Sequence, residues 1–288
     1  MRICLECGEG PVSSDWVCPV CHHQPEQKDG YLSFAPQFSG PKEDYPPDQY
    51  PLLAAVESES FWLRARSRLI TWSLKRYFQK IDNFLEVGCG TGLVLSNVSS
   101  AFPHLDLSAS EIDSEGFDYV SQRVRKVKLI QMDARRIPFK EEFNVIGAFD
   151  VIEHIEEDEA VLSQIYNACR PGGGVIITVP QHPWLWSEFD TYACHKRRYV
   201  RSELKSKVEN AGFQICCLTS FVSFLLPAMG FARLFRKKKE TFDPLAEQKV
   251  SPLTNRIFYG IMTLERMILK TGLSLPVGGS LLCVGLKK

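Results

Sequence analysis

The sequence has no excess of charge, no long apolar run and no leading apolar segment, and each absence excludes a class of protein. Its 288 residues carry 34 basic and 34 acidic side chains. General nucleic-acid binders usually have a basic excess, so this balance argues against nucleic acid as a partner. No apolar run approaches the ~20 residues of a membrane-spanning helix. The first residues also lack the apolar core of a signal peptide, so we expect a cytoplasmic protein.

Four of the ten cysteines have the spacing of metal ligands rather than of a disulfide framework. Cys4-x-x-Cys7 and Cys18-x-x-Cys21 can each wrap a tight knuckle, and four thiolates can close a tetrahedron around one Zn²⁺. A segment this short cannot bury a core, so the metal would stabilise it. The sequence therefore predicts a small zinc ribbon over residues 1–30, which serves recruitment, contact with the substrate, or only folding and docking.

Two further regions follow the predicted ribbon. Residues 31–56 are rich in proline, glycine and acid, which indicates a linker or an irregular arm. The pattern becomes helical from residue 57 to residue 80, and we expect one large domain over residues 57–288. Arg66 and its aromatic neighbours on this helix either pack on a sheet or cover a ligand pocket.

Strands and helices alternate after residue 80, which predicts a mostly parallel sheet with helices on both faces. In such a sheet the ligand binds at the carboxyl ends of the strands, so polar residues at those ends are the candidates for function. The expected strands are 83–87, 105–111, 127–131, 143–149 and 174–180, and the expected helices between them are 92–101, 115–125 and 158–169.

The first of these strands ends in a glycine turn that opens a helix. Glu86 is followed by Gly88, Gly90 and Gly92 at alternate positions. Glycine allows positive φ and a close approach to a ligand, and the N–H groups of a helix N-terminus suit a polar or anionic ligand. A dinucleotide fingerprint would place its third glycine at residue 93, where this sequence has leucine.

Acids also stand at the ends of the next two strands. Glu111 lies close to the spacing at which an acid meets a ribose, and a carboxylate can accept hydrogen bonds from both hydroxyls of a ribose diol. Asp133 can accept a hydrogen bond from an exocyclic amine such as that of adenine. Either acid alone could be a helix cap or a solvated charge. Together with Glu86 they favour one shared adenosine-containing ligand.

These motifs, with two later ones, resemble the class I S-adenosylmethionine (SAM) methyltransferases. The later motifs are residues 149–155 (FDVIEHI) and 170–174 (RPGGG). The resemblance spans about residues 84–220, and the pattern in residues 182–213 is similar to a bacterial small-molecule subgroup of type 11/12/23. It implies a Rossmann-like sheet of seven strands whose last strand is antiparallel, with 213–219 and 281–287 as strands six and seven.

The resemblance also implies which residues hold the cofactor SAM. The acid and the glycines at the end of the first strand would back the methionine moiety of SAM. The acid at the end of the second strand would bind the ribose, and two residues after the third strand would contact adenine. One further acid would lie at the methionine end, beneath the helix that covers the pocket. The matched residues are Glu86, Gly88, Gly90, Glu111, Asp133, Ala134 and Asp150, with Arg66 on the covering helix.

Acid–base candidates lie where the fourth and fifth strands end. Glu153, His154 and His195 could take the proton of an oxygen or nitrogen nucleophile, because histidine titrates near neutrality. With Asp150 they also resemble the Glu-x-x-Glu-His…His constellation of small-RNA 2′-O-methyltransferases, which would hold Mg²⁺ or Mn²⁺. A pocket wall with no catalytic duty is the third interpretation of residues 153 and 154.

The C-terminal third contains an insertion over residues 220–275 that we expect to be helical. An apolar run followed by basic residues, 221–239, either packs as a lid or lies on a membrane surface. Residues 240–251 are expected to form a mobile loop.

The expected function is methyl transfer from SAM to an oxygen or nitrogen of a small molecule, with lipid and glycan precursors among the candidate acceptors. An RNA-modifying enzyme, or a non-catalytic scaffold that docks a partner through the ribbon, are the alternatives.

Overall fold

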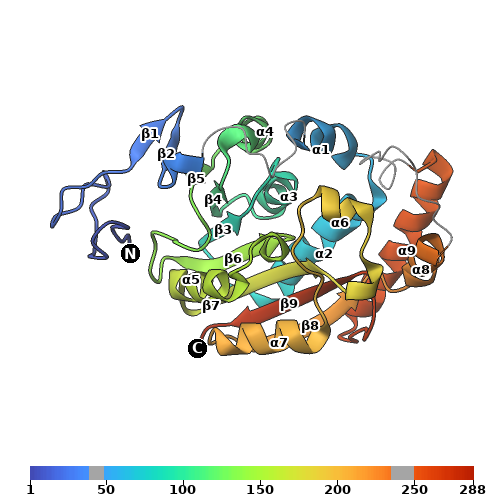
Figure 1. Cartoon of the computed structure of the whole chain (residues 1–288). Helices are drawn as coiled ribbons and strands as arrows, with labels where there is room; N and C mark the ends of the chain where they lie inside the picture. The colour runs from blue at the N-terminus through green and yellow to red at the C-terminus, as the bar shows by residue number, and fades with distance from the viewer. Residues whose placement is uncertain (39–48, 235–249) are drawn as a thin grey trace.

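A computed structural model describes residues 1–38, 49–234 and 250–288. Within these residues nine strands form one sheet, in the order β1-β2-β5-β4-β3-β6-β7-β9-β8 (Figure 1). The strands are β1 (Glu26–Lys28), β2 (Tyr31–Ser33), β3 (Asn83–Val87), β4 (Asp106–Glu111), β5 (Lys128–Gln131), β6 (Phe143–Phe149), β7 (Cys169–Pro180), β8 (Gln214–Phe221) and β9 (Ser280–Leu286).

The helices cover both faces of this sheet, as the sequence predicted. The helices in the described ranges are α1 (Gln49–Glu57), α2 (Phe61–Tyr77), α3 (Leu93–Ala101), α4 (Phe117–Arg123), α5 (Asp158–Ala168), α6 (Glu188–Tyr192), α7 (Arg201–Asn210), α8 (Leu226–Leu234) and α9 (Pro252–Lys270). No helix in these ranges is long and apolar enough to cross a membrane.

The central part of the sheet is confirmed as Rossmann-like. Strands β5, β4, β3, β6 and β7 are parallel neighbours. Strand β9 lies between β7 and β8 and is antiparallel to both, as expected for the last strand. Every parallel strand therefore ends at the same edge, where the candidate ligand residues follow.

The expectation of seven strands is wrong, because a hairpin from the N-terminal part of the chain extends the sheet. Strand β2 pairs in parallel with β5, with Leu32 opposite Ile130 and Ser33 opposite Gln131, and β1 pairs with β2. Without this hairpin β5 would be an open edge, which proteins usually cover. Two three-residue strands carry too little periodicity to be recognised in a sequence.

Side chains of alternate strand residues enter two separate cores, one on each face. Phe84 packs with α2, α3 and α9, whereas its neighbour Leu85 packs with α5 and α7. This alternation follows from the two-residue period of a strand. The second core also contains Trp16 from the cysteine-rich N-terminal unit, so that unit shares the face that α5 and α7 cover.

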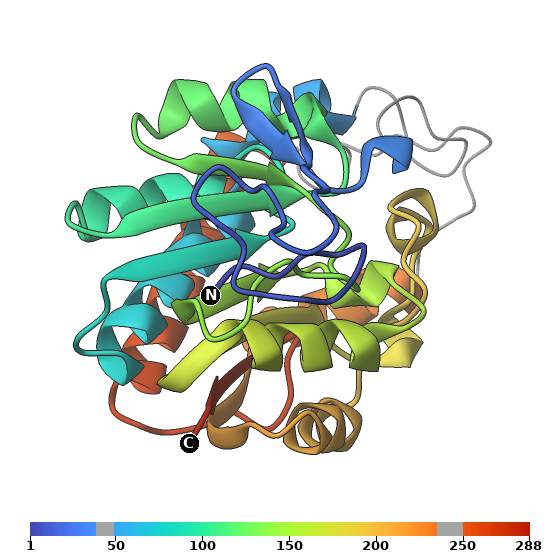
Figure 2. The same ribbon diagram turned by 90° about the vertical axis from the view of Figure 1, so that its left-hand side faces the viewer.

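The N-terminal unit lies directly against the sheet face. The Trp16 ring meets the rings of Phe34 and Phe139 edge-on, with centroids 4.8 and 5.5 Å away. The backbone N–H of Ile3 donates to the carbonyl oxygen of Pro138 at 3.0 Å. Figure 2 shows these N-terminal loops lying across the strands in front of the sheet. The unit is thus packed as a layer of the domain.

The C-terminal insertion is helical, as expected, and α8 and α9 connect β8 to β9. The side chain of Asn255 accepts from the N–H of Phe61 at 2.8 Å, which joins the start of α9 to the start of α2. The buried Glu265 accepts three backbone N–H bonds from Val222, Ser223 and Phe224. These bonds hold the turn after β8 against α9.

Parts of two predictions lie outside the described residues. They are the basic end of segment 221–239 and almost all of the loop expected at 240–251. The apolar part of 221–239 is divided between core and surface, since Val222 and Leu225 are buried whereas Phe231 is 63% exposed. The stretch 31–56, expected as a linker or arm, contains β2 and α1 in its described parts.

Candidate functional site

The glycine turn after β3 has the backbone that its sequence predicts. Gly88, Gly90 and Gly92 have φ values of 69°, 52° and 77°, all in the left-handed region. A Cβ atom on Gly88 would lie 2.4 Å from the side chain of Val151, so no larger residue fits there. The turn opens α3 at Leu93 and leaves the N-terminal N–H groups of that helix at the carboxyl edge of the sheet.

Glu111 at the end of β4 is bonded to this glycine turn. Its carboxylate accepts from the N–H of Gly90 and from the N–H of Ile112, each at 3.0 Å. The glycine turn predicted to back the methionine moiety and the strand end predicted to bind the ribose are therefore joined through one carboxylate.

Asp133, at the end of the third predicted strand, is held by a charged neighbour. Burial would raise the pKa of Asp133, but hydrogen bonds from Arg135 outweigh it and hold the pKa below its ordinary value. Asp133 is therefore ionised at neutral pH. Ala134 beside it is buried.

Gln131 is a structural residue of this strand end that sequence reasoning missed. It is fully buried, and its Nε2 donates to the carbonyl oxygens of Ala35 and Ile112 at 2.6 and 3.0 Å. Its Oε1 accepts from the Ser33 hydroxyl. Gln131 thus ties β2 to the residue after Glu111, and nothing in its sequence position signals this role.

The predicted methionine end of the pocket holds three ionisable groups. Arg66 from α2 forms an ion pair with Asp150, which follows β6 and has a φ of 57°. The Arg66 guanidinium also lies 4.7 Å from the centre of the Trp62 ring. Burial raises the pKa of Glu86 to about 8, although Arg66 acts to lower it.

These charges fit the zwitterionic methionine end of SAM. Glu86 Oε2 is buried and has no hydrogen-bond partner among the described residues, and the same holds for Arg66 Nε. Buried polar atoms are normally hydrogen-bonded, so an unpartnered one marks a place for a ligand group. An acid suits the α-ammonium of SAM and a guanidinium suits its carboxylate.

The acid–base candidates come together beyond the ends of β6 and β7. The donor atoms of Glu153, His154 and His195 all lie within 4.8 Å of one another, although His195 is 41 residues from His154 in sequence. The two histidine rings meet edge-on with centroids 4.6 Å apart. Burial, reinforced by His195, lowers the pKa of His154 to about 3, so that ring is neutral.

Glu153 is the most enclosed member of this group. Its side chain is fully buried, and neither carboxylate oxygen has a hydrogen-bond partner from any residue that the structure describes. Burial raises the pKa of Glu153 to about 8. A carboxyl group of this kind can exchange a proton near neutral pH.

His195 is oriented by a buried ion pair. Its Nδ1 lies 2.8 Å from Oδ1 of Asp190, and Arg198 donates to both oxygens of Asp190 at 2.8 and 2.9 Å. Burial would raise the pKa of Asp190, but His195 and Arg198 together hold it well below its ordinary value. Because Asp190 is an acceptor, Nδ1 carries the proton and Nε2 has the free lone pair. Sequence spacing alone cannot identify this pairing.

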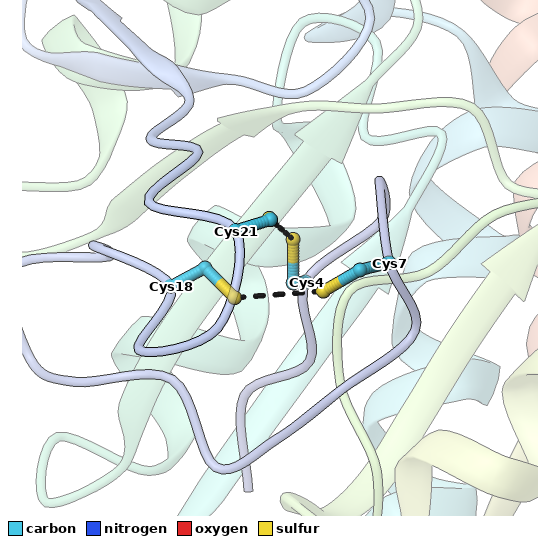
Figure 3. Close-up of side chains that lie close together, drawn as sticks. All are labelled: Cys4, Cys7, Cys18 and Cys21. Atoms are coloured by element: carbon cyan, nitrogen blue, oxygen red, sulfur yellow. Dashed lines mark hydrogen bonds between the residues drawn. The ribbon is translucent and has the colours of Figure 1, made fainter.

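Two groups of side chains fit a metal ion, the first being the four N-terminal cysteines. The sulfur atoms of Cys4 and Cys21 are 3.5 Å apart, and those of Cys7 and Cys18 are 3.6 Å apart (Figure 3). Thiolates around a tetrahedral Zn²⁺ would be about 3.8 Å apart. The cluster is thus compatible with the predicted zinc ribbon.

The second group is Glu153, His154 and His195, whose carboxylate and imidazoles have the donor chemistry of a divalent transition-metal site. Asp150, the fourth predicted ligand, lies in the ion pair with Arg66 instead. The structure therefore assembles three of the four predicted ligands.

Comparison with known proteins places this site in a family. The family described as "Methyltransferase domain" matches residues 55–218. A probable S-adenosylmethionine-dependent methyltransferase of Mycolicibacterium smegmatis is 24% identical over 57% of this chain and 63% of its own length. A phosphatidylethanolamine N-methyltransferase of Cereibacter sphaeroides is 34% identical over 32% of this chain and 48% of its own length. The match thus spans about half to two thirds of these relatives.

A solved structure supports the fold. A chain in the complex of the Haloferax volcanii Trm112 methyltransferase activator with a methyltransferase superposes with a TM-score of 0.56 and 13% identity. The match covers 84% of this chain and 99% of that one. At this identity the likeness concerns the fold alone.

Proposed function

This chain belongs to the methyltransferase-domain family, and from that premise we propose that it transfers the methyl group of SAM to an oxygen or nitrogen of a small-molecule acceptor. The SAM sulfonium supplies an activated methyl group, so the protein has to align the nucleophile, exclude water and remove a proton. The observation that carries the proposal is the buried His195–Asp190–Arg198 chain beside Glu153.

The cofactor roles follow from the charges around the glycine turn. Glu86 would accept from the SAM ammonium and Arg66 would meet its carboxylate, because both side chains keep buried polar atoms for such groups. Glu111, already held by Gly90 and Ile112, would accept from the ribose hydroxyls. Asp133 and Ala134 would line the adenine position. Each group pairs one part of SAM with a matching donor or acceptor.

His195 would act as the general base. Its Nε2 would take the proton of the acceptor O–H or N–H as the nucleophile accepts the methyl group that SAM would supply, with the bonding electron pair left on the SAM sulfur. The imidazolium that forms is stabilised by Asp190, whose charge Arg198 keeps in place.

Two observations support a small acceptor. The His195 side chain is only 10% exposed and Glu153 is fully buried, so the reacting group has to reach into the domain. The balanced charge of 34 basic and 34 acidic residues does not favour an RNA backbone. A phosphatidylethanolamine enzyme among the relatives is consistent with lipid precursors as candidates.

Labelled SAM can test the acceptor class. The protein is incubated with methyl-tritiated SAM and a cell extract, which is then separated into lipid, small polar, RNA and protein fractions. We expect label in the lipid or small polar fraction. Label confined to RNA would favour the RNA-modifying alternative, and unlabelled fractions with no SAM binding in calorimetry would favour a scaffold.

Replacing the proposed base tests the mechanism. His195→Gln should reduce labelling of that fraction by about 100-fold or more while SAM affinity stays within about twofold. The exposed His104→Gln serves as the matched control and should leave both unchanged. Equal activity of His195→Gln and the unaltered protein would reject His195 as the base.

The cluster of Glu153, His154 and His195 favours metal-assisted transfer as a second candidate. Chelation followed by Mg²⁺ or Mn²⁺ should restore labelling only if this cluster holds a catalytic metal. Zinc content measured in parallel separates this effect from loss of metal at the four cysteines.

A further inference from the structure

Helix α9 is apolar on two opposite sides. Its inner side packs on the domain through the buried Met262 and Leu269. Four apolar residues with helical spacing lie on the outer side, where they face solvent. They are Leu253, Ile257, Leu264 and Met267, with exposed fractions of 70%, 51%, 54% and 58%.

A helix with apolar residues on both sides is usually covered on both sides. At 3.6 residues per turn, the four outer side chains fall on one stripe directly opposite Met262 and Leu269. The stripe runs along most of a 19-residue helix. Exposed apolar surface of this kind marks a contact with another molecule.

Positive charge lies along one flank of α9, on the side that meets α2. The guanidinium groups of Arg64 and Arg68 on α2 lie 4.5 and 5.4 Å from the centre of the Tyr259 ring on α9. Arg266 lies two turns further along α9 on the Tyr259 side. Within the part of the chain that the structure describes, none of these three arginines forms an ion pair with a carboxylate.

The flank also has polar atoms that the protein does not satisfy. Arg266 Nε and the Tyr259 hydroxyl are buried and lack a hydrogen-bond partner in residues 1–38, 49–234 and 250–288. Glu265 is the acid within α9, but it is buried and accepts three backbone N–H bonds. It therefore faces away from the arginines, and the flank carries net positive charge.

We propose that the outer side of α9 docks on the surface of an anionic lipid bilayer. The four apolar side chains would enter the boundary between headgroups and acyl chains, and Arg64 and Arg68 would meet lipid phosphates. Interfacial helices combine these two features, an apolar stripe and a basic flank. This docking is independent of the methyl acceptor and of the proposed chemistry.

Charge and shape favour a bilayer over a second copy of the chain. An antiparallel symmetric contact through α9 would bring the same arginine flank of two copies together, which costs electrostatic energy. A bilayer accepts a single helical stripe lying in its plane. The surface differs from the predicted membrane segment 221–239, because Val222 and Leu225 of that segment are buried in the core.

Co-sedimentation with vesicles tests the proposal on the full chain. We expect the protein to bind phosphatidylcholine vesicles that contain phosphatidylglycerol, and to bind pure phosphatidylcholine vesicles much more weakly. High salt should weaken the binding. Equal binding to both vesicle types, or none to either, would overturn the proposal.

Variants locate the contact. Leu264→Asp should weaken vesicle binding by more than about tenfold, because a carboxylate cannot enter the acyl boundary. Arg64→Gln and Arg68→Gln should each weaken it by about fivefold, and only for anionic vesicles. Val200→Asp, at an exposed position before α7, is the matched control and should change nothing.

Unfolding and self-association could each change vesicle binding, and two measurements separate them from a lost bilayer contact. SAM affinity measured by calorimetry should be the same for all four variants, which shows that each one is folded. Gel filtration should give the same size for Leu264→Asp and the unaltered protein. A shift from dimer to monomer with unchanged vesicle binding would show that α9 covers a second copy and would reject the bilayer.

Discussion

Polar groups on the β5 side of the candidate site are hydrogen-bonded within the protein, whereas several on the β6–β7 side have no partner among the described residues. Gln131, Glu111 and Asp133 each accept or donate hydrogen bonds within the protein. By contrast, Glu153 and Thr178 have buried polar atoms that no described residue satisfies.

The difference would suit two tasks of the proposed methyl transfer. The adenosine half of SAM is the same in every turnover, so a preorganised set of hydrogen bonds suits it. The methionine end and the acceptor bring charges and protons that change during transfer, and polar atoms without protein partners can serve them. Four predictions test this contrast, from the largest expected effect to the smallest.

The largest effect is expected at the four cysteines, where loss of the proposed zinc should destabilise the β5 side of the site. Chelation or Cys18→Ser should lower the free energy of unfolding by about 3 kcal/mol or more, because Trp16 would lose its packing on the sheet. Urea denaturation measures the change, and Cys216→Ser, at an exposed cysteine outside the cluster, is the control. Unchanged stability would mean that the unit packs without metal.

Gln131→Ala should come next. It leaves the buried carbonyl oxygen of Ala35, the partly buried carbonyl oxygen of Ile112 and the Ser33 hydroxyl without their partner, at a cost of about 2–3 kcal/mol. SAM affinity should also fall, since Ile112 adjoins Glu111. The exposed Gln122→Ala provides the comparison. Full SAM affinity of Gln131→Ala would mean that β2, which Gln131 ties to the site, does not support binding of the adenosine half of SAM.

On the side with unpartnered groups, Glu86 should make the free energy of unfolding depend on pH. Burial raises the pKa of Glu86 from 4.5 to about 8, so the folded protein holds the proton of this carboxyl group more tightly than the unfolded chain does. The resulting contribution to the free energy of unfolding is complete below pH 4.5 and is lost as pH rises through 8. Without SAM, Glu86→Gln should flatten the decline in unfolding free energy across this window. The exposed Glu159→Gln should leave the slope as it is.

The smallest effect is expected at Thr178. Its hydroxyl oxygen is buried without a partner in the described ranges, so Thr178→Val should change the unfolding free energy by less than about 0.5 kcal/mol or raise it. Thr219→Val is the variant to compare, because Thr219 is buried and its Oγ1 accepts from the N–H of Leu275 at 2.9 Å. That change should cost about 1 kcal/mol. Equal losses at both sites would contradict the contrast.

Local patterns predicted much of the domain. The strands from β3 to β9 lie within a few residues of their expected positions, except that β7 begins at Cys169 rather than at residue 174. Helix α2 begins one residue after its N-cap Ser60, four residues inside the expected range. Such elements are recognisable because each is long enough to show its period.

The sequence by itself determined where the candidate cofactor residues would gather, because the carboxyl ends of parallel strands share one edge. It also determined the cysteine cluster, since two knuckles need only local spacing. Only the tertiary structure decided that β2 covers the edge at β5, that Asp150 faces Arg66, and that Asp190 orients His195. Each of these contacts joins short or irregular segments whose partners are chosen by packing, and no period in the chain records that choice.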